Sequence, residues 1–200
     1  MPNSPLVAHG AAPGAQPWRS GGANVAWFAV DRLQQEKLMP DLTSLAAAVG
    51  ALLKERQHTV AVAESASGGL ISAALVAIPG ASAYFVGGGV IYTRTSGRGL
   101  LQIPDDALTG MRASTEPYAL LNARTIRTIL GTTWGLAETG ASGPTGNRYG
   151  DAAGHACIAV AGPVERSITL ETGVADREAN MWTFAKAALD LLAACAQAHH

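Results

Sequence analysis

Residues 59–70 read Thr59-Val60-Ala61-Val62-Ala63-Glu64-Ser65-Ala66-Ser67-Gly68-Gly69-Leu70. The β-branched and alanine run at 59–63 predicts a buried strand. The apolar segment after the two glycines, from Leu70 to about Ile78, predicts a helix. A strand that turns directly into a helix is the first unit of an α/β fold, and the rest of the chain can be interpreted from this turn.

The turn at 64–69 has the composition of a ligand-binding or catalytic site. At such a turn the unpaired amide groups of the helix face the sheet edge, where they can bind an anion or a developing oxyanion. A hydroxyl group on the turn can act as a nucleophile. A flexible turn with Ser67 as the helix cap would have the same sequence, so the pattern alone leaves both interpretations open.

Composition limits the class of protein. The 200 residues, 48% hydrophobic and 14% charged, are enough for one compact, alanine-rich α/β domain. The net charge of −1 lacks the basic excess of nucleic-acid-binding proteins. Cys157 and Cys195 lie in apolar runs, which favours buried thiols in a reducing cytoplasm over a disulfide. The sequence contains no cysteine or histidine pair with metal-ligand spacing and no apolar run long enough to span a membrane. We therefore expect a cytoplasmic protein that binds no metal or cofactor. We also expect no nucleic-acid or membrane partner.

Residues 1–40 are rich in Gly, Pro, Ala and Ser and show no sustained periodicity. Because they lack the charged start and apolar core of a signal peptide, we interpret them as a flexible extension, or as the product of a start codon assigned too early, with Met39 as the true start. Packing of Trp18 and of residues 25–30 on the domain is the alternative. The folded domain is expected to span residues 41–198.

The remaining periodicities complete an α/β pattern. They predict helices at 41–53, 114–130 and from 176 onward, and strands at 84–92, 134–139, 155–161 and 166–171. Tyr118 and Ile129 are expected on the buried face of the second of these helices, and Thr93 to Gly99 is expected to be irregular. The last two strands are joined by Gly162-Pro163-Val164-Glu165 and are expected to form a hairpin. Together these elements predict a three-layer α/β/α sandwich with a mixed, mostly parallel sheet.

A second glycine-rich loop, residues 140–151, follows the strand at 134–139. In open α/β sheets, ligands bind at the carboxyl ends of the strands. The turn at 64–69 and this loop both leave strands at such ends, so we expect them to face one cleft.

The sequence resembles the CinA carboxy-terminal domain family, whose members are nicotinamide-nucleotide amidases, from about Asp41 to Ala196. The family's Glu-Ser-Cys-Thr-Gly-Gly is similar to residues 64–69, and its Pro-Gly-Ser-Ser to residues 79–82. Its Val-Thr-Tyr-Ser-Asn corresponds to residues 90–94, and its Thr/Ser-Gly-Ile-Ala-Gly-Pro loop to residues 139–144. Four landmarks in the same order support the resemblance.

The resemblance implies hydrolysis of the carboxamide of nicotinamide mononucleotide by a serine nucleophile, a lysine base and a tyrosine, without a metal. The motifs assign the nucleophile to Ser65 and the tyrosine to Tyr92. The lysine position is occupied by Gly97, and the flanking Arg94 and Arg98 remain protonated and cannot act as bases.

His155, just beyond the second loop, is therefore a candidate base, with an ordinary packed histidine as the alternative. Glu64 is a second candidate, or a carboxylate that binds turn amides or a ribose hydroxyl. Arg148, in the second loop, is the candidate cation that pairs with a substrate phosphate; the alternative is that it is an ordinary surface arginine without a ligand. The predicted substrate-binding set is Glu64, Ser67, Gly68, Gly69, Gly140, Ser142, Gly143, Thr145 and Arg148.

Three functions fit these residues. The first is a nucleotide amidase that acts through Ser65 with a rearranged base, and the second is a non-catalytic homologue that binds a nucleotide as a sensor. An amidase or esterase with another substrate is the third. The partner is expected to be a small-molecule nucleotide, and the resemblance implies a homo-oligomer, for which we expect a dimer.

Overall fold

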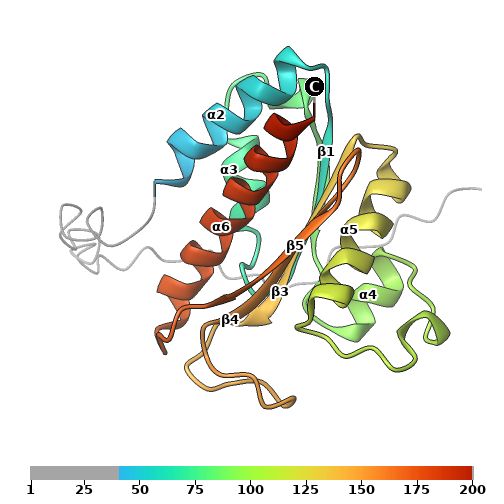
Figure 1. Ribbon diagram of the computed structural model, residues 1–200, viewed down its shortest axis with the longest axis vertical. Helices are drawn as coiled ribbons and strands as arrows, with labels where there is room; N and C mark the ends of the chain where they lie inside the picture. Colours follow the sequence, from blue (N-terminus) through green and yellow to red (C-terminus); the bar gives the residue numbers. More distant parts are fainter. Residues whose placement is uncertain (1–40, 200) are drawn as a thin grey trace, which may run out of the picture.

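The computed structural model describes residues 41–199. The expectations for residues 1–40, including Met39, Trp18 and the segment 25–30, lie outside the described residues. The described part folds around a sheet of five strands in the order β2-β1-β3-β4-β5. Helices cover both faces of this sheet, which gives three layers (Figure 1).

The strands are β1 (Val60–Glu64), β2 (Phe85–Val90), β3 (Trp134–Ala141), β4 (His155–Ala161) and β5 (Arg166–Glu171). β1 lies between β2 and β3 and pairs with both in parallel. β4 is antiparallel to β3 and to β5, so four of the five strands run in one direction. The predicted mixed, mostly parallel sheet is confirmed, as is the hairpin between β4 and β5.

The helices are α2 (Leu42–Glu55), α3 (Leu70–Val76), α4 (Arg94–Leu100), α5 (Glu116–Leu130) and α6 (Arg177–Ala198), with short 3-10 turns at 81–83 and 106–108. α2 begins where the sequence predicts, because the Asp41 carboxylate accepts hydrogen bonds from Thr43 N and Ser44 N. α6 is capped in the same way by Asp176. α2, α3 and α6 cover one face of the sheet, and α5 covers the other (Figure 1).

The two sides of the sheet have different cores. Large side chains such as Leu53, Leu136 and Leu189 fill the space beneath α2, α3 and α6. The side beneath α5 is built mainly from alanine, which lets this helix approach closely: a Cβ on Gly135 would lie 1.9 Å from the Ala123 carbonyl oxygen. Cys157 and Cys195 are both buried and free, as predicted.

Two local predictions are wrong. The segment after β2 is a helix, α4, because Thr93 and Ser96 form a capping box at its start. The buried face of α5 is made of Ala119, Asn122, Ala123 and Ile126, since the close approach to the sheet requires small residues there. Tyr118 is half-buried instead and Ile129 is exposed.

Candidate active site

Two adjoining pockets are formed where β1 and β3 end. The larger has a volume of about 480 Å³ and the smaller of about 230 Å³. They share Tyr92, Gly140 and Asn147 as lining residues. Ser65 lines the larger pocket and Ala66 the smaller, so the turn and the second loop face one cleft, as predicted.

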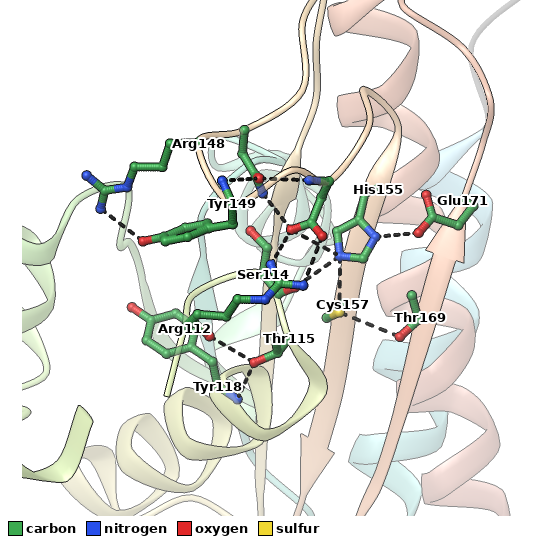
Figure 2. Close-up of polar contacts among 12 residues, drawn as sticks. Arg112, Ser114, Thr115, Tyr118, Arg148, Tyr149, His155, Cys157, Thr169 and Glu171 are labelled. Carbon is green, nitrogen blue, oxygen red and sulfur yellow. Dashed lines mark hydrogen bonds and ion pairs between the residues drawn. The ribbon is translucent and has the colours of Figure 1, made fainter. Parts of the chain in front are cut away.

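The larger pocket brings together Ser65 and Tyr92, the two residues that the motifs assign to catalysis. Tyr92 is 59% exposed, so a ligand in the cleft can reach it. The rest of the lining is aromatic and polar and contains two arginines: Ile91, Thr93, Arg94, Ala113, Ser114, Tyr118, Thr139, Gly140, Asn147, Arg148 and Tyr149. In Figure 2 the phenol groups of Tyr118 and Tyr149 point to the same side.

Glu64 lies beneath the turn and is fully buried. Its carboxylate accepts hydrogen bonds from Gly69 N, Ile71 N and Ser72 N at 2.8 to 3.0 Å. It thereby caps α3, whose start has no other side-chain cap because Gly69 occupies that position with φ of +104°. The predicted role of Glu64 in substrate binding is therefore wrong, and the alternative, a carboxylate that binds turn amides, describes its contacts.

Glu138 is a second buried carboxyl group at the turn, reached from β3. Its Oε2 accepts hydrogen bonds from Ser65 N at 3.1 Å, Ser67 N at 2.8 Å and Ser67 Oγ at 2.8 Å. Its Oε1 is buried and has no hydrogen-bond partner among the described residues. Burial raises the pKa of Glu138 to about 7, although the hydrogen bonds from Ser67 and Ser65 oppose this rise.

These two carboxyl groups correct the prediction for the turn. The Ser67 hydroxyl contacts both Glu64 Oε2 and Glu138 Oε2, so it supports the turn and neither caps α3 nor reaches a pocket. Gly68 and Gly69, with positive φ, shape the chain here and do not line either pocket. The amides at the start of α3, which we expected to be free for an oxyanion, are already bonded to Glu64.

One turn amide remains available. Within residues 65–72 of the described chain, only Ala66 N makes no hydrogen bond. Ala66 directly follows Ser65 and lines the smaller pocket. A donor in that position can bind an oxyanion that forms when Ser65 attacks a carbonyl group.

The second loop is tied to the turn through Ser142. The Ser142 hydroxyl donates to the Ala66 carbonyl at 2.8 Å and is buried. Its one hydrogen is used in this bond, and Ser142 also lines the smaller pocket, so its predicted place at a substrate-binding loop stays a prediction. Asn180 of α6 in turn donates to the Ser142 carbonyl at 2.8 Å, so the loop is held between the turn and α6.

The other predicted loop residues lie at the pockets. Gly140 lines both, and Gly143 and Thr145 line the smaller one. Arg148 lines the larger pocket, and its guanidinium donates to the Tyr149 hydroxyl at 2.9 Å and lies 5.0 Å from the centre of that ring. A cation that packs against an aromatic ring is preorganised to meet a planar or anionic ligand.

His155 is not placed to act as the base. It is buried and absent from the lining of both pockets. Its Nδ1 faces Glu171 Oε1 at 2.5 Å and its Nε2 faces the Ser114 carbonyl at 3.0 Å (Figure 2). Burial lowers the pKa of His155, but the hydrogen bonds and the charges of Glu171 and Asp151 outweigh burial and raise it. With acceptors at both nitrogens the ring is held as a double donor, which argues against the predicted base.

The histidine belongs to a network that fixes the second loop. Asp151 lies 3.9 Å from His155 Nε2, forms a two-pronged ion pair with Arg112, and accepts a hydrogen bond from Asn147 Nδ2 at 2.8 Å. These hydrogen bonds, first that of Arg112, lower the pKa of Asp151. The network therefore orders the loop that carries Arg148 and Tyr149 into the pocket.

Sequence reasoning missed several residues of this site. Glu138 sits in a strand, and its partners are more than 70 residues away, so no local spacing indicates it. Arg177 of α6 lines the smaller pocket and was also missed. Tyr118 was expected in the core, and Tyr149 and Asn147 lie within the predicted loop, where their aromatic and amide groups were a usable signal.

A family model described as the CinA C-terminal domain matches residues 42–196. The chain belongs to the CinA family. A CinA-like protein from Cyanothece sp. is 43% identical over 123 residues, which cover 62% of this chain and 29% of that protein. A CinA superfamily protein from Klebsiella pneumoniae shares the fold with a TM-score of 0.75 and 24% identity, covering 80% of this chain and 99% of its own.

The competence/damage inducible protein CihA from Agrobacterium tumefaciens has a TM-score of 0.72 and 28% identity, with 78% of this chain and 97% of the other covered. The resemblance inferred from the four landmarks is thereby confirmed. The chain spans about a third of the length of the curated relatives it matches. No helix within residues 41–199 combines the length and apolarity needed to cross a membrane.

Proposed function

We propose that this CinA-family protein is an amidohydrolase that acts on the carboxamide of an aromatic nucleotide such as nicotinamide mononucleotide, with Ser65 as the nucleophile. The observation that carries the proposal is the presence of Ser65 and Tyr92 in one pocket. The unbonded amide of Ala66 beside them supports it, because amide hydrolysis requires a nucleophile, a proton-transferring group and a donor to the oxyanion.

The lining of the two pockets also supports a nucleotide. Tyr92, Tyr118 and Tyr149 offer aromatic surface to a planar base, and Arg94, Arg148 and Arg177 offer positive charge to a phosphate. Neither lining contains an aspartate or a glutamate from the described chain, so nothing there repels an anion. Within the third function, an amidase or esterase with another substrate, the lining therefore favours an anionic substrate such as the mononucleotide over an uncharged one.

In the proposed reaction, Ser65 Oγ attacks the carboxamide carbon and the carbonyl oxygen gains negative charge next to Ala66 N. The C–N bond breaks, ammonia leaves, and an ester between Ser65 and the nucleotide acid remains. Water then hydrolyses this ester and regenerates the serine. Each step moves a proton near Ser65, and Tyr92 is the member of the expected catalytic set that shares the pocket with it.

Ammonia release from nicotinamide mononucleotide tests the proposal. We expect wild type and Ser82→Ala to be active and Ser65→Ala to lose activity by about a thousandfold or more, as for the loss of other serine nucleophiles. Ser82 is exposed and belongs to neither lining, which makes it a matched control. Equal rates for wild type and Ser65→Ala would reject the amidase.

A non-catalytic nucleotide-binding protein is the second candidate, and one observation favours it. Gly97 occupies the lysine position of the family motif, and no lysine of the described chain lines either pocket. If no ammonia is released, calorimetry with nicotinamide mononucleotide separates a binding protein, which produces heat at micromolar to millimolar ligand, from a protein that does not use this ligand.

A further inference from the structure

The loss of the motif lysine leaves Tyr92 without the cation that the motif would place five residues later. Gly97 lies in α4 and is buried. Beyond its own helix, a Cβ built on it would meet Ile91 Cγ2 at 3.8 Å and no cationic side chain of the described residues. Negative charge develops on the phenol oxygen if Tyr92 takes part in proton transfer, so a cation in contact with this oxygen is needed. Arg94 of α4 lines the larger pocket, but among the described residues it forms no hydrogen bond with the Tyr92 hydroxyl.

Arg177 provides such a charge from the first turn of α6. Its Nη2 donates to the Tyr92 hydroxyl oxygen at 3.0 Å, and its Nη1 donates to the Gly143 carbonyl at 2.7 Å. Both partners line the smaller pocket together with Arg177. One planar guanidinium thus joins Tyr92, the second residue after β2, to the loop after β3 and fixes the distance between them.

The charge of Arg177 is not neutralised by a carboxylate. Arg98, Arg112 and Arg124 each form an ion pair with an aspartate or glutamate, whereas within residues 41–199 Arg177 forms none. Its positive charge is therefore directed at the phenol oxygen and the pocket. Asp176 caps α6 through Ala179 N and so faces the helix backbone.

We propose that Arg177 is the cation at Tyr92 in this chain, which lacks the motif lysine, and that it acts as a positioning residue for Tyr92 in the reaction proposed above. An arginine only donates hydrogen bonds, so the Tyr92 oxygen accepts from Arg177 and its own hydrogen is free to point into the pocket. Arg177 keeps its proton throughout and is not a base.

In the proposed reaction, Tyr92 accepts one proton and donates another, so its own protonation state is restored. As Ser65 Oγ bonds to the carboxamide carbon, its hydrogen passes to the Tyr92 oxygen, and the phenol hydrogen passes to the nitrogen of the breaking C–N bond. Ammonia leaves and Tyr92 is neutral again. If the phenol hydrogen leaves before the serine hydrogen has fully arrived, the phenol oxygen carries negative charge. Arg177 stabilises this charge.

The test is a double-mutant cycle on ammonia release from nicotinamide mononucleotide. We expect Arg177→Gln and Tyr92→Phe each to lower kcat by about a hundredfold with KM changed less than about threefold, and the double variant to be no worse than Tyr92→Phe. Arg177→Lys keeps the charge and should recover at least about a tenth of the wild-type kcat. Arg166→Gln, an exposed arginine on β5, is the matched control.

Two results would overturn the inference. Losses that multiply in the double variant would mean that Arg177 does not act through the Tyr92 hydroxyl. A rise in KM alone, which disappears with the phosphate-free riboside as substrate, would assign Arg177 to the phosphate instead.

The inference rests on the proposed function, and a second measurement separates their failures. If wild type releases no ammonia, the proposed substrate is wrong, and acetylation of Ser65 by 4-nitrophenyl acetate then decides about Arg177, with Ser65→Ala as the background. A loss of about tenfold or more in both Arg177→Gln and Tyr92→Phe would uphold the inference. Unchanged acetylation in the variants, or no Ser65-dependent acetylation in wild type, would overturn it.

Discussion

Glu138 is an acidic residue in a buried position, where the ionised form of its carboxyl group is destabilised by the loss of solvation. Glu138 is 1% exposed, and the Ser67 hydroxyl between it and Glu64 has one hydrogen for two carboxyl oxygens. A proton on Glu138 relieves this arrangement, which agrees with a pKa raised to about 7 by burial. The turn that carries Ser65 is thus supported by a group that changes charge near neutral pH.

This charge change predicts how stability depends on pH. Because the pKa of Glu138 is higher in the folded chain than the ordinary 4.5, the folded state binds the proton more tightly. The stabilisation is complete below about pH 4.5 and is lost as the pH rises through 7, by on the order of 3 kcal/mol. Glu138→Gln carries no charge, so its unfolding free energy should fall less than that of wild type between pH 5 and 8.

Urea unfolding at several pH values measures this difference. All other titrating groups, including His155, are common to the two proteins, so the comparison isolates position 138. Parallel curves for wild type and Glu138→Gln would show that Glu138 does not titrate in this range.

Among the elements, α3 is capped by a residue that lies outside the helix and its N-cap position, in the preceding strand. A capping carboxylate usually sits at the N-cap, yet here Glu64, the last residue of β1, bonds Gly69 N, Ile71 N and Ser72 N. The strand, the turn and the helix therefore form one unit around a single side chain. The composition of the turn led to the prediction of a site, and the same residues prove to be mostly the support of that site.

Removal of this carboxylate should weaken the whole unit. In Glu64→Gln an NH₂ group replaces one acceptor and faces backbone donors, so we expect a loss of about 3 kcal/mol or more in unfolding free energy. Glu55→Gln, an exposed change at the end of α2, should stay within about 0.5 kcal/mol of wild type. Thermal and urea unfolding compare the two, and equal stability of both variants would contradict the capping role.

The limits of sequence reasoning follow from the same elements. Strands β4 and β5 and the cap of α2 were predicted to the residue because their signals are local: a hairpin, an alternation and an aspartate before an apolar period. α4 was missed because its two glycines hide the period and only its capping box indicates a helix. Glu138 and Arg177 could not be found locally, since Glu138 meets Ser67 from 71 residues away and Arg177 meets Tyr92 from 85 residues away.

At the level of the whole molecule, the described sheet has two edge strands, β2 and β5, and β2 is the one without a charged residue. Within residues 41–199 no strand pairs with its outer side, and residues 85–90 contain no charged side chain of the kind that protects edge strands. Exposed apolar side chains surround it on the strand and on the neighbouring helices: Val76, Val86, Val90, Leu100, Ile129 and Leu130. Leu130 and Leu100 reach toward Gly87 and Gly89 of this strand.

We therefore expect the wild type to be a homodimer that pairs β2 with β2 of a second copy. An uncharged strand with glycines at its centre can approach its own copy without charge repulsion, and the surrounding apolar side chains then pack against their equivalents around a two-fold axis. Val86→Lys should halve the mass seen in light scattering, because the lysine would be desolvated in that contact. Val174→Lys changes an exposed valine away from β2 and should leave the dimer intact. A monomeric wild type would show that no dimer forms. A dimeric wild type with equal masses for the two variants would show that the copies do not meet at β2.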